Sequence, residues 1–387
     1  MPAKAKRSGL DVARLRHLKA VIEDDIKRGR YYGGVIIVAR DGVIGMHEAI
    51  GFVEPKTRQP VKKNHVFSLF STTKAITNVL VFRAIERGEF AFTTRVCDII
   101  PEFRGGQREQ ITFFHLLTHS SGLPSVFTPR EGMYIDRLDE IVAAICENVH
   151  SVAPPGEVIN YAPMAAHALM GEAVRRTDPK KRSYRQLAED EIFKPLKMKD
   201  TAIGVRKDLK RRKIVPIFID PFPAVHPGHS NLGPNGAFEE EHAEMPWVGA
   251  VSTTADLFRF AEMLRRGGEL DDARILSPAI LDLANRNWTG DKPNELYKKL
   301  VEPRGWGEYP AYLGLGFQVR GERIVHSLLG TLTSPRTFGN YGAGSSLFWV
   351  DPERQLTFVC LTAGVMNGVE NIERFQRLSD IAVSAAV

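Results

Sequence analysis

The sequence predicts an α+β fold: one antiparallel sheet, flanked by helices from the two ends of the chain, with a large helical lobe inserted between the strands. Three observations predict it. The chain opens with a helical pattern followed by a hairpin, it closes with a hairpin followed by a helical pattern, and the region in between is mostly helical. Strand pairs at both ends, each beside an amphipathic helix, are typical of one sheet covered by helices.

The opening helix and hairpin have clear patterns. Apolar residues recur every three or four positions between residues 10 and 30, with charged residues on the other faces, as in an amphipathic helix. Two β-rich runs then flank Asp41 and Gly42. This pair is a strong hairpin signal because glycine tolerates the positive φ of a type I′ turn. We therefore expect a helix followed by two paired strands.

The closing segment mirrors this order. Two β-rich runs, residues 345–350 and 355–364, flank a turn at residues 351–354. A helical pattern begins at Val369 and continues toward the end of the chain. We expect this second hairpin to join the first in one sheet, with the last helix packed on it.

The middle of the chain shows mostly helical patterns and long loops rich in proline and glycine. No internal repeat and no separating linker is visible. We expect residues 1–65 and 305–387 to form the sheet lobe and residues 66–304 to form the helical lobe. The two lobes should make one functional unit with its site between them, since pockets form where such layers meet.

Composition and charge exclude several classes of protein. The 387 residues are 43% apolar and 25% charged, which is typical of a globular chain and excludes a disordered one. The net charge is +6, and the densest basic run, residues 206–213, is short and lacks interleaved aromatic residues. We expect that run to be a solvated face, and we expect no nucleic-acid partner.

Cysteine use and hydropathy favour a cytoplasmic location. Cys97, Cys146 and Cys360 form an odd set without C-x-x-C spacing, as expected for buried thiols and not for disulfides or a zinc site. The N-terminal residues lack the apolar core of a secretory signal, and no run of about 18 apolar residues suits a membrane span. The sequence does not indicate an oligomeric state.

Ser71 and Lys74 form the clearest chemical motif. They lie where a helical pattern begins, and a spacing of three residues places both side chains on one helix face. A serine hydroxyl becomes a good nucleophile only when a base takes its proton, and a lysine amine is such a base only if burial lowers its pKa. By itself the S-x-x-K spacing also suits an ordinary helix start followed by a solvated lysine.

Further segments along the chain support a catalytic interpretation. Tyr161 precedes a helix that Pro163 can begin, and a glycine-rich strand follows near the end of the chain. The segments are LLTHSSGLP (116–124), PPGEVINYAP (154–163), IFKPLKMKDT (192–201), GAVSTTADL (249–257), LGLGF (313–317) and FGNYGAG (338–344). Each is a weak signal alone, but their order and separations are specific.

Together with Ser71 and Lys74, these segments resemble the serine β-lactamase and penicillin-binding-protein superfamily, whose hallmark is S-x-x-K. The similarity is to the branch that holds class C β-lactamases, D-amino-acid peptidases and family VIII esterases, and it covers about residues 35–364. The resemblance implies a β-lactamase/transpeptidase-like fold and a serine hydrolase that works through an acyl-enzyme.

The resemblance also implies roles for individual residues. Ser71 would be the acylated nucleophile, Lys74 its base, and Tyr161 the phenol that exchanges a proton with Ser71 and the leaving group. A cationic Lys74 would make this phenol easier to ionise. The backbone N–H groups of Ser71 and Ala343 would form the oxyanion hole. Substrate-binding residues would be Asn340, Tyr341, Gly342 and Trp247, with Phe222 as another candidate wall in the loop 216–247.

Two departures from the family pattern bear on the substrate. The second motif is usually Tyr-x-Asn, but here Pro163 stands in the place of the asparagine and removes an amide that would contact an amide or β-lactam. The third motif usually begins with Lys or His, but here it begins with Asn340. A neutral amide holds a substrate carboxylate less well than a cation does. We therefore expect a carboxylesterase that acts on neutral esters.

Other functions stay open. Arg320 or Arg336 would restore the missing charge if either lay near the site, and the protein would then be a β-lactamase, a D-amino-acid peptidase or a penicillin-binding protein. A non-catalytic binding protein and an acyltransferase of the same fold are further alternatives. In each catalytic case the partner is a small-molecule ester or amide.

The remaining patterns imply no cofactor and no metal. No phosphate-binding glycine loop precedes a helix, and no G-x-S-x-G elbow surrounds a serine. His226, His229 and His242 lie near three glutamates, but the segment is loop-like and lacks regular ligand spacing. His115 and His119 are expected to be packing and turn residues.

Overall fold

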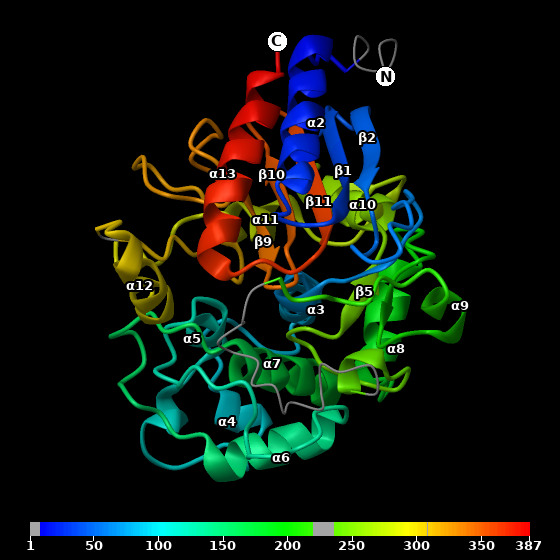
Figure 1. The fold of residues 1–387 in the computed structure, drawn as a ribbon. Coiled ribbons are helices and arrows are strands. Elements are labelled where there is room, and N and C mark those ends of the chain that lie inside the picture. The colour runs from blue at the N-terminus through cyan, green and yellow to red at the C-terminus, as the bar shows by residue number, and fades with distance from the viewer. Residues whose placement is uncertain (1–7, 220–235, 308) are drawn as a thin grey trace.

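The structure, a computed structural model, describes residues 8–219, 236–307 and 309–387. Its centre is an antiparallel six-stranded sheet with the strand order β2-β1-β11-β10-β9-β8 (Figure 1). The strands are β1 (Gly33–Arg40), β2 (Val43–Gly51), β8 (Gln318–Val319), β9 (Phe338–Gly342), β10 (Ser346–Asp351) and β11 (Leu356–Ala363).

Both predicted hairpins are confirmed, and they share this sheet. Asp41 and Gly42 connect β1 to β2 with φ values of 50° and 75°, as a tight turn between twisted strands requires. β1 also pairs with β11, so that Val35 lies opposite Leu361. This pairing joins the two ends of the chain, and the predicted α+β fold is confirmed.

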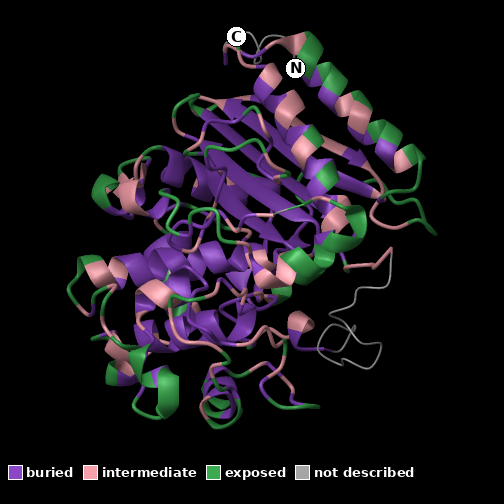
Figure 2. Cartoon of the chain, turned by 90° about the vertical axis from the view of Figure 1, so that its left-hand side faces the viewer, coloured by how far each residue is buried: buried purple, intermediate pink, exposed green. Residues whose placement is uncertain are grey.

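The terminal helices α2 (Val12–Lys27) and α13 (Gly368–Ser384) lie side by side on one face of the sheet (Figure 1). Helix α10 (Thr254–Arg265) packs against β1, β10 and β11. Because successive strand residues point to opposite faces, Ile36 and Val38 belong to the core under the terminal helices, while Val35 and Ile37 belong to the larger core on the other side. Both faces are buried (Figure 2).

The middle of the chain supplies most of the other elements. Its helices are α3 (Lys74–Glu86), α4 (Val96–Ile99), α5 (Phe113–Leu117), α6 (Leu138–Asn148), α7 (Pro163–Thr177), α8 (Tyr184–Ala188), α9 (Lys207–Lys210), α11 (Pro278–Ala284) and α12 (Glu295–Val301). Its short strands are β3 (Phe67–Ser68), β4 (Ala202–Ile203), β5 (Ala250–Ser252), β6 (Glu269–Leu270) and β7 (Ala273–Arg274). Helix α10 belongs to this middle region by sequence, yet it packs on the sheet. The proposed division into two lobes at residues 65 and 305 stays a prediction. Within the described ranges, no helix has both the length and the apolar character needed to cross a membrane.

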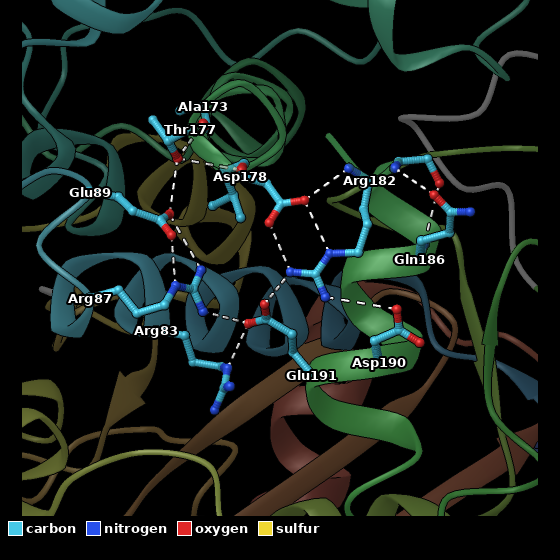
Figure 3. Close-up of polar contacts among 12 residues, drawn as sticks. Arg83, Arg87, Glu89, Ala173, Thr177, Asp178, Arg182, Gln186, Asp190 and Glu191 are labelled. Atoms are coloured by element: carbon cyan, nitrogen blue, oxygen red, sulfur yellow. Dashed lines mark hydrogen bonds and ion pairs between the residues drawn. The ribbon is translucent and has the colours of Figure 1, made fainter. Parts of the chain in front are cut away.

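A buried cluster of ion pairs anchors helix α3, which begins at Lys74 (Figure 3). The carboxylate of Glu191, 8% exposed, accepts hydrogen bonds at 2.7 Å from each of Arg83, Arg87 and Arg182. Arg182 also donates to Asp178 at the end of α7. Burial alone would raise the pKa of Glu191, but the hydrogen bonds from the arginines outweigh it and lower that pKa. The cluster therefore fixes α3 against α7 and the segment after α8.

Candidate active site

Ser71 lies in a short 3-10 turn, Phe70–Thr73, between strand β3 and helix α3. Phe70 has a φ of 50°, in the left-handed region that side chains rarely adopt. Two polar atoms from different parts of the chain lie 2.9 Å from Ser71 Oγ: the Nζ of Lys74 and the hydroxyl of Tyr161. The structure thus brings together the three residues that the sequence proposed for catalysis.

Lys74 is buried, with 2% of its surface exposed. Its Nζ donates a hydrogen bond to the carbonyl oxygen of Trp247 at 2.9 Å and lies 5.2 Å from the ring centre of Tyr161. Among the residues described by the structure, no carboxylate forms an ion pair with this amine. Burial without a counter-charge lowers the pKa of Lys74 well below its usual value. A neutral amine at this position can accept the proton of Ser71.

The phenol of Tyr161 is also held in its neutral form. Burial raises its pKa, and the hydrogen bond to Ser71 offsets this only in part. That a cationic Lys74 would ease ionisation of this phenol stays a prediction, because burial lowers the pKa of Lys74 while it raises that of Tyr161. In this hydrogen-bonded group, burial shifts the amine of Lys74 and the phenol of Tyr161 toward their neutral forms.

His119 holds the segment that carries Tyr161. Its backbone carbonyl accepts from the N–H of Asn160 at 2.9 Å, and its Nδ1 accepts from the N–H of Ala162 at 3.4 Å. The centres of the His119 and Tyr161 rings lie 4.8 Å apart. Burial lowers the pKa of His119 to about 3, so the ring stays neutral. His119 is a turn and packing residue, as expected. It packs against Tyr161, so it helps to position the proposed catalytic phenol.

The end of strand β9 lies against the Ser71 turn because two glycines leave room. A Cβ on Gly342 would lie 2.2 Å from the carbonyl oxygen of Leu69, and one on Gly344 would lie 2.2 Å from the ring of Phe70. Ser346 Oγ donates to that same carbonyl at 2.8 Å. Ala343, between the two glycines, lines the same cavity as Ser71. Its assignment to the oxyanion hole, with the N–H of Ser71, stays a prediction.

Asn340 and Tyr341 also line this cavity, but their polar atoms differ in availability. The amide nitrogen of Asn340 donates to Gly316 at 3.4 Å, and its buried Oδ1 has no hydrogen-bond partner in the part of the chain that the structure describes. The hydroxyl of Tyr341 accepts from Asn371 at 3.0 Å. Asn371 also donates to Ser345 at 3.1 Å, so α13 holds the turn between β9 and β10 from behind.

Neither arginine that was considered as a replacement cation serves the cavity. Arg336 donates to Asp282 and Asn285, and Arg320 donates to four backbone carbonyls of the segment 321–331. Neither lines the cavity that holds Ser71. The expectation that one of them would restore the missing charge is therefore wrong, because each is bonded elsewhere.

The cavity has a volume of about 650 Å³, and Trp247 lines it as expected. Arg304 also lines it, but ion pairs with Glu370 and Glu373 engage its guanidinium. Phe222, His226 and His229 lie outside the described residues. Sequence reasoning missed Tyr297 and Tyr309, which form one wall of the cavity, because no motif marks either residue.

Comparison with known proteins gives a consistent picture. The family model described as Beta-lactamase matches residues 18–382. Esterase EstB of Burkholderia gladioli is 37% identical over 134 residues, which is 33% of this chain and 34% of that protein. Penicillin-binding protein 4 of Amycolatopsis lactamdurans is 29% identical over 290 residues, covering 72% of this chain and 71% of that protein. Protein flp of Staphylococcus aureus (strain MW2) is 27% identical over 48% of this chain, and the match spans 38% of that protein.

Solved structures share the fold. A penicillin-binding-protein homologue from Caulobacter crescentus superimposes with a TM-score of 0.78 at 23% identity, covering 97% of this chain and 98% of that one. A family VIII carboxylesterase has a TM-score of 0.75 at 19% identity, with 95% and 98% covered. EstCE1, described as a hydrolase with promiscuous acyltransferase activity, has a TM-score of 0.75 at 18% identity, with 96% and 98% covered.

Proposed function

Because the chain belongs to the beta-lactamase family, we propose that it is a serine hydrolase that forms an acyl-enzyme on Ser71, and that its substrates are neutral carboxylic esters. One observation carries the proposal: Ser71 Oγ lies 2.9 Å from both a desolvated lysine amine and a phenol. Esterase EstB is among the relatives, in agreement with this activity.

The proposed acylation begins with proton transfer. The neutral Nζ of Lys74 takes the proton of Ser71 while Oγ attacks the ester carbonyl carbon. The tetrahedral oxyanion is stabilised by the N–H groups of Ser71 and Ala343, and losing one such donor typically costs about 2.7–4 kcal/mol of barrier. The C–O bond to the alcohol then breaks, and the departing oxygen takes a proton from Tyr161, which Lys74 reprotonates.

Deacylation repeats these transfers with water in place of the alcohol. As the water oxygen attacks the acyl carbon, Tyr161 takes one proton from the water and passes its own proton to the neutral Lys74. Lys74 then returns a proton to Ser71 Oγ as the bond to the acid breaks. The carbonyl of Trp247 keeps the amine directed at Ser71 in both half-reactions. The 2.9 Å separations of Ser71 Oγ from the Nζ of Lys74 and from the hydroxyl of Tyr161 suit proton transfer to and from Ser71.

The charge around the cavity favours esters over β-lactams and D-amino-acid peptides. Those alternatives carry a carboxylate, and Asn340 offers it only a neutral amide. Arg304 is paired with Glu370 and Glu373, while Arg320 and Arg336 are bonded away from the cavity. The relative named penicillin-binding protein 4 is the observation that supports this second candidate function.

Ester and β-lactam turnover separate the two candidates. Purified protein should hydrolyse p-nitrophenyl butyrate, the Ser71→Ala variant should not, and turnover of the chromogenic cephalosporin nitrocefin should be much slower. Equal ester rates in the wild-type protein and the Ser71→Ala variant would defeat the proposal. Nitrocefin turnover comparable with ester turnover would favour the second candidate. No ester turnover together with no fluorophosphonate adduct on Ser71 after long exposure would instead fit a binding protein. Ester product appearing only with added alcohol would fit an acyltransferase.

We also propose that the protein works in the cytoplasm on a small-molecule substrate. Cys97, Cys146 and Cys360 are all free thiols, which suits a reducing compartment. Thiol titration of protein purified under non-reducing conditions should find all three cysteines unpaired.

A further inference from the structure

The cavity beside Ser71 is larger than a short ester needs. Its volume of about 650 Å³ falls within the range of roughly 300–1,000 Å³ that is typical of pockets for drug-sized ligands. An acetyl or butyryl ester would leave most of this space to water. The residues that line the unfilled part of the cavity therefore help to determine which substrate fits.

Two tyrosines form that wall. Tyr297 lies on helix α12 and Tyr309 on the segment that follows, and their rings are stacked with centroids 5.8 Å apart and an angle of 13° between the planes. The ring of Tyr297 also meets the ring of Tyr161 edge-on at 6.3 Å. The aromatic wall thus begins at the proposed catalytic phenol and extends away from it.

The hydroxyls of this wall are available to a ligand. Within residues 8–219, 236–307 and 309–387, neither Tyr297 nor Tyr309 has a hydrogen-bond partner for its hydroxyl, and both residues line the cavity. Burial raises the pKa of Tyr297 to about 12 and raises that of Tyr309 as well, so both phenols keep their protons. Each can donate one hydrogen bond to a neutral oxygen.

The lining of the cavity suits an uncharged ligand better than a charged one. No aspartate or glutamate is among the described residues that line it. Lys74 is desolvated with a lowered pKa, and Arg304 is engaged by two glutamates. A buried ligand charge would find no free counter-charge on Lys74 or Arg304, and burying an unpaired charge is costly.

We propose that Tyr297 and Tyr309 form a subsite for the bulky half of the substrate, an uncharged ring system that carries a hydrogen-bonding oxygen. This inference rests on the ester hydrolysis proposed above and specifies its substrate class. Aromatic rings stack on one another or meet edge to face, and the phenol hydroxyls recognise the oxygen. The ring belongs to either the acyl or the alcohol half of the ester.

Three esters of similar reactivity test the subsite. Ethyl acetate is the minimal substrate, ethyl 2-naphthylacetate carries a ring on the acyl side, and 2-(2-naphthyl)ethyl acetate carries it on the alcohol side. Hydrolysis is followed by pH-stat titration. One naphthyl ester should exceed ethyl acetate in kcat/KM by about tenfold or more, since a well-placed aromatic contact plus burial is worth at least about 1.4 kcal/mol. The preferred ester identifies the half that the subsite holds.

Tyr309→Leu should reduce that preference about tenfold, whereas Tyr32→Leu, at the start of β1 and away from the cavity, should keep it. Equal kcat/KM for all three esters, or an unchanged preference in Tyr309→Leu, would overturn the inference.

A binding measurement separates this inference from the proposed function. The Ser71→Ala protein is titrated with 2-(2-naphthyl)ethanol and with 2-ethylnaphthalene, which lacks the oxygen, and naphthyl fluorescence reports binding. Tyr309→Phe in that background should weaken the alcohol about three- to tenfold and leave the hydrocarbon unchanged. Equal effects on both ligands would overturn the role of the phenol. Tyr309-dependent binding in a protein that hydrolyses no ester would support the subsite while defeating the proposed function.

Discussion

The backbone carbonyl oxygen of Trp247 accepts a hydrogen bond from the Nζ of Lys74 at 2.9 Å. A main-chain acceptor fixes the direction of the amine without supplying the negative charge that would keep it protonated. Burial can then lower the pKa of Lys74, and the amine can act as a base toward Ser71. The proposed chemistry depends on an amine that is held toward Ser71 and that, among the described residues, has no carboxylate beside it to keep it protonated.

Replacing Lys74 by arginine tests the need for a neutral base. A guanidinium keeps its proton throughout the physiological range, so Lys74→Arg keeps a long nitrogen-bearing side chain but loses the proton acceptor. We expect kcat for p-nitrophenyl butyrate to fall by about 10²–10⁴-fold, as for the loss of a general base. Retention of more than a third of wild-type kcat in a folded Lys74→Arg protein would contradict this role.

The lowered pKa of Lys74 also predicts how stability varies with pH. The unfolded chain holds this amine near its usual pKa of 10.5, so between the lowered folded value and 10.5 the unfolded state binds more protons. Stability must then rise with pH through that window. Lys74→Met removes the effect, so the Tm of the variant minus the Tm of the wild type should decrease as the pH rises through this window toward 10.5. A Tm difference independent of pH would mean that folded Lys74 stays protonated.

Gly342 predicts a steric limit at the site. A Cβ there would lie 2.2 Å from the carbonyl oxygen of Leu69 and 2.4 Å from Ser346 Oγ, so Gly342→Ala should push β9 away from the Ser71 turn. We expect kcat to fall by at least about tenfold.

Gly45→Ala is the matched control, because its Cβ would crowd only the side chains of Leu10 and Ser8 beside strand β2. It should lower Tm while leaving kcat unchanged. Equal kcat values for the Gly342 and Gly45 variants would show that β9 does not need to approach Ser71 so closely.

The ion-pair cluster in Figure 3 predicts a stability effect away from the chemistry. Glu191→Gln leaves Arg83, Arg87 and Arg182 without their shared carboxylate, and we expect a loss of about 1–3 kcal/mol, since the arginines are partly exposed. Urea unfolding should show this loss. Asp98→Asn is the control, since its pair with Arg95 is exposed and such pairs contribute little. Equal midpoints for both variants would mean that the cluster does not anchor α3.

Local patterns predicted much of this structure. The Asp41-Gly42 turn, the closing hairpin and the terminal helices follow from periodicity and turn chemistry, and both hairpins are in one sheet as expected. The closeness of Ser71 and Lys74 follows from their spacing. Tyr161 is ninety positions away from Ser71, and only the resemblance to a family placed it beside the serine.

Tertiary contacts decided the rest. The sequence left Arg320 and Arg336 as candidate cations because it does not reveal that backbone carbonyls and Asp282 engage them. The stacking of Tyr297 on Tyr309 depends on how α12 folds over the cavity, and no local signal marks it. The pKa of Tyr161 also depends on burial that only the assembled site reveals.

The most direct test of the central claim is intact-mass spectrometry after reaction with a fluorophosphonate, followed by peptide mapping. Our account predicts one adduct per chain, located on Ser71, absent from Ser71→Ala and formed much more slowly by Lys74→Arg. An adduct on another residue, or an unlabelled wild-type protein after long exposure, would contradict it.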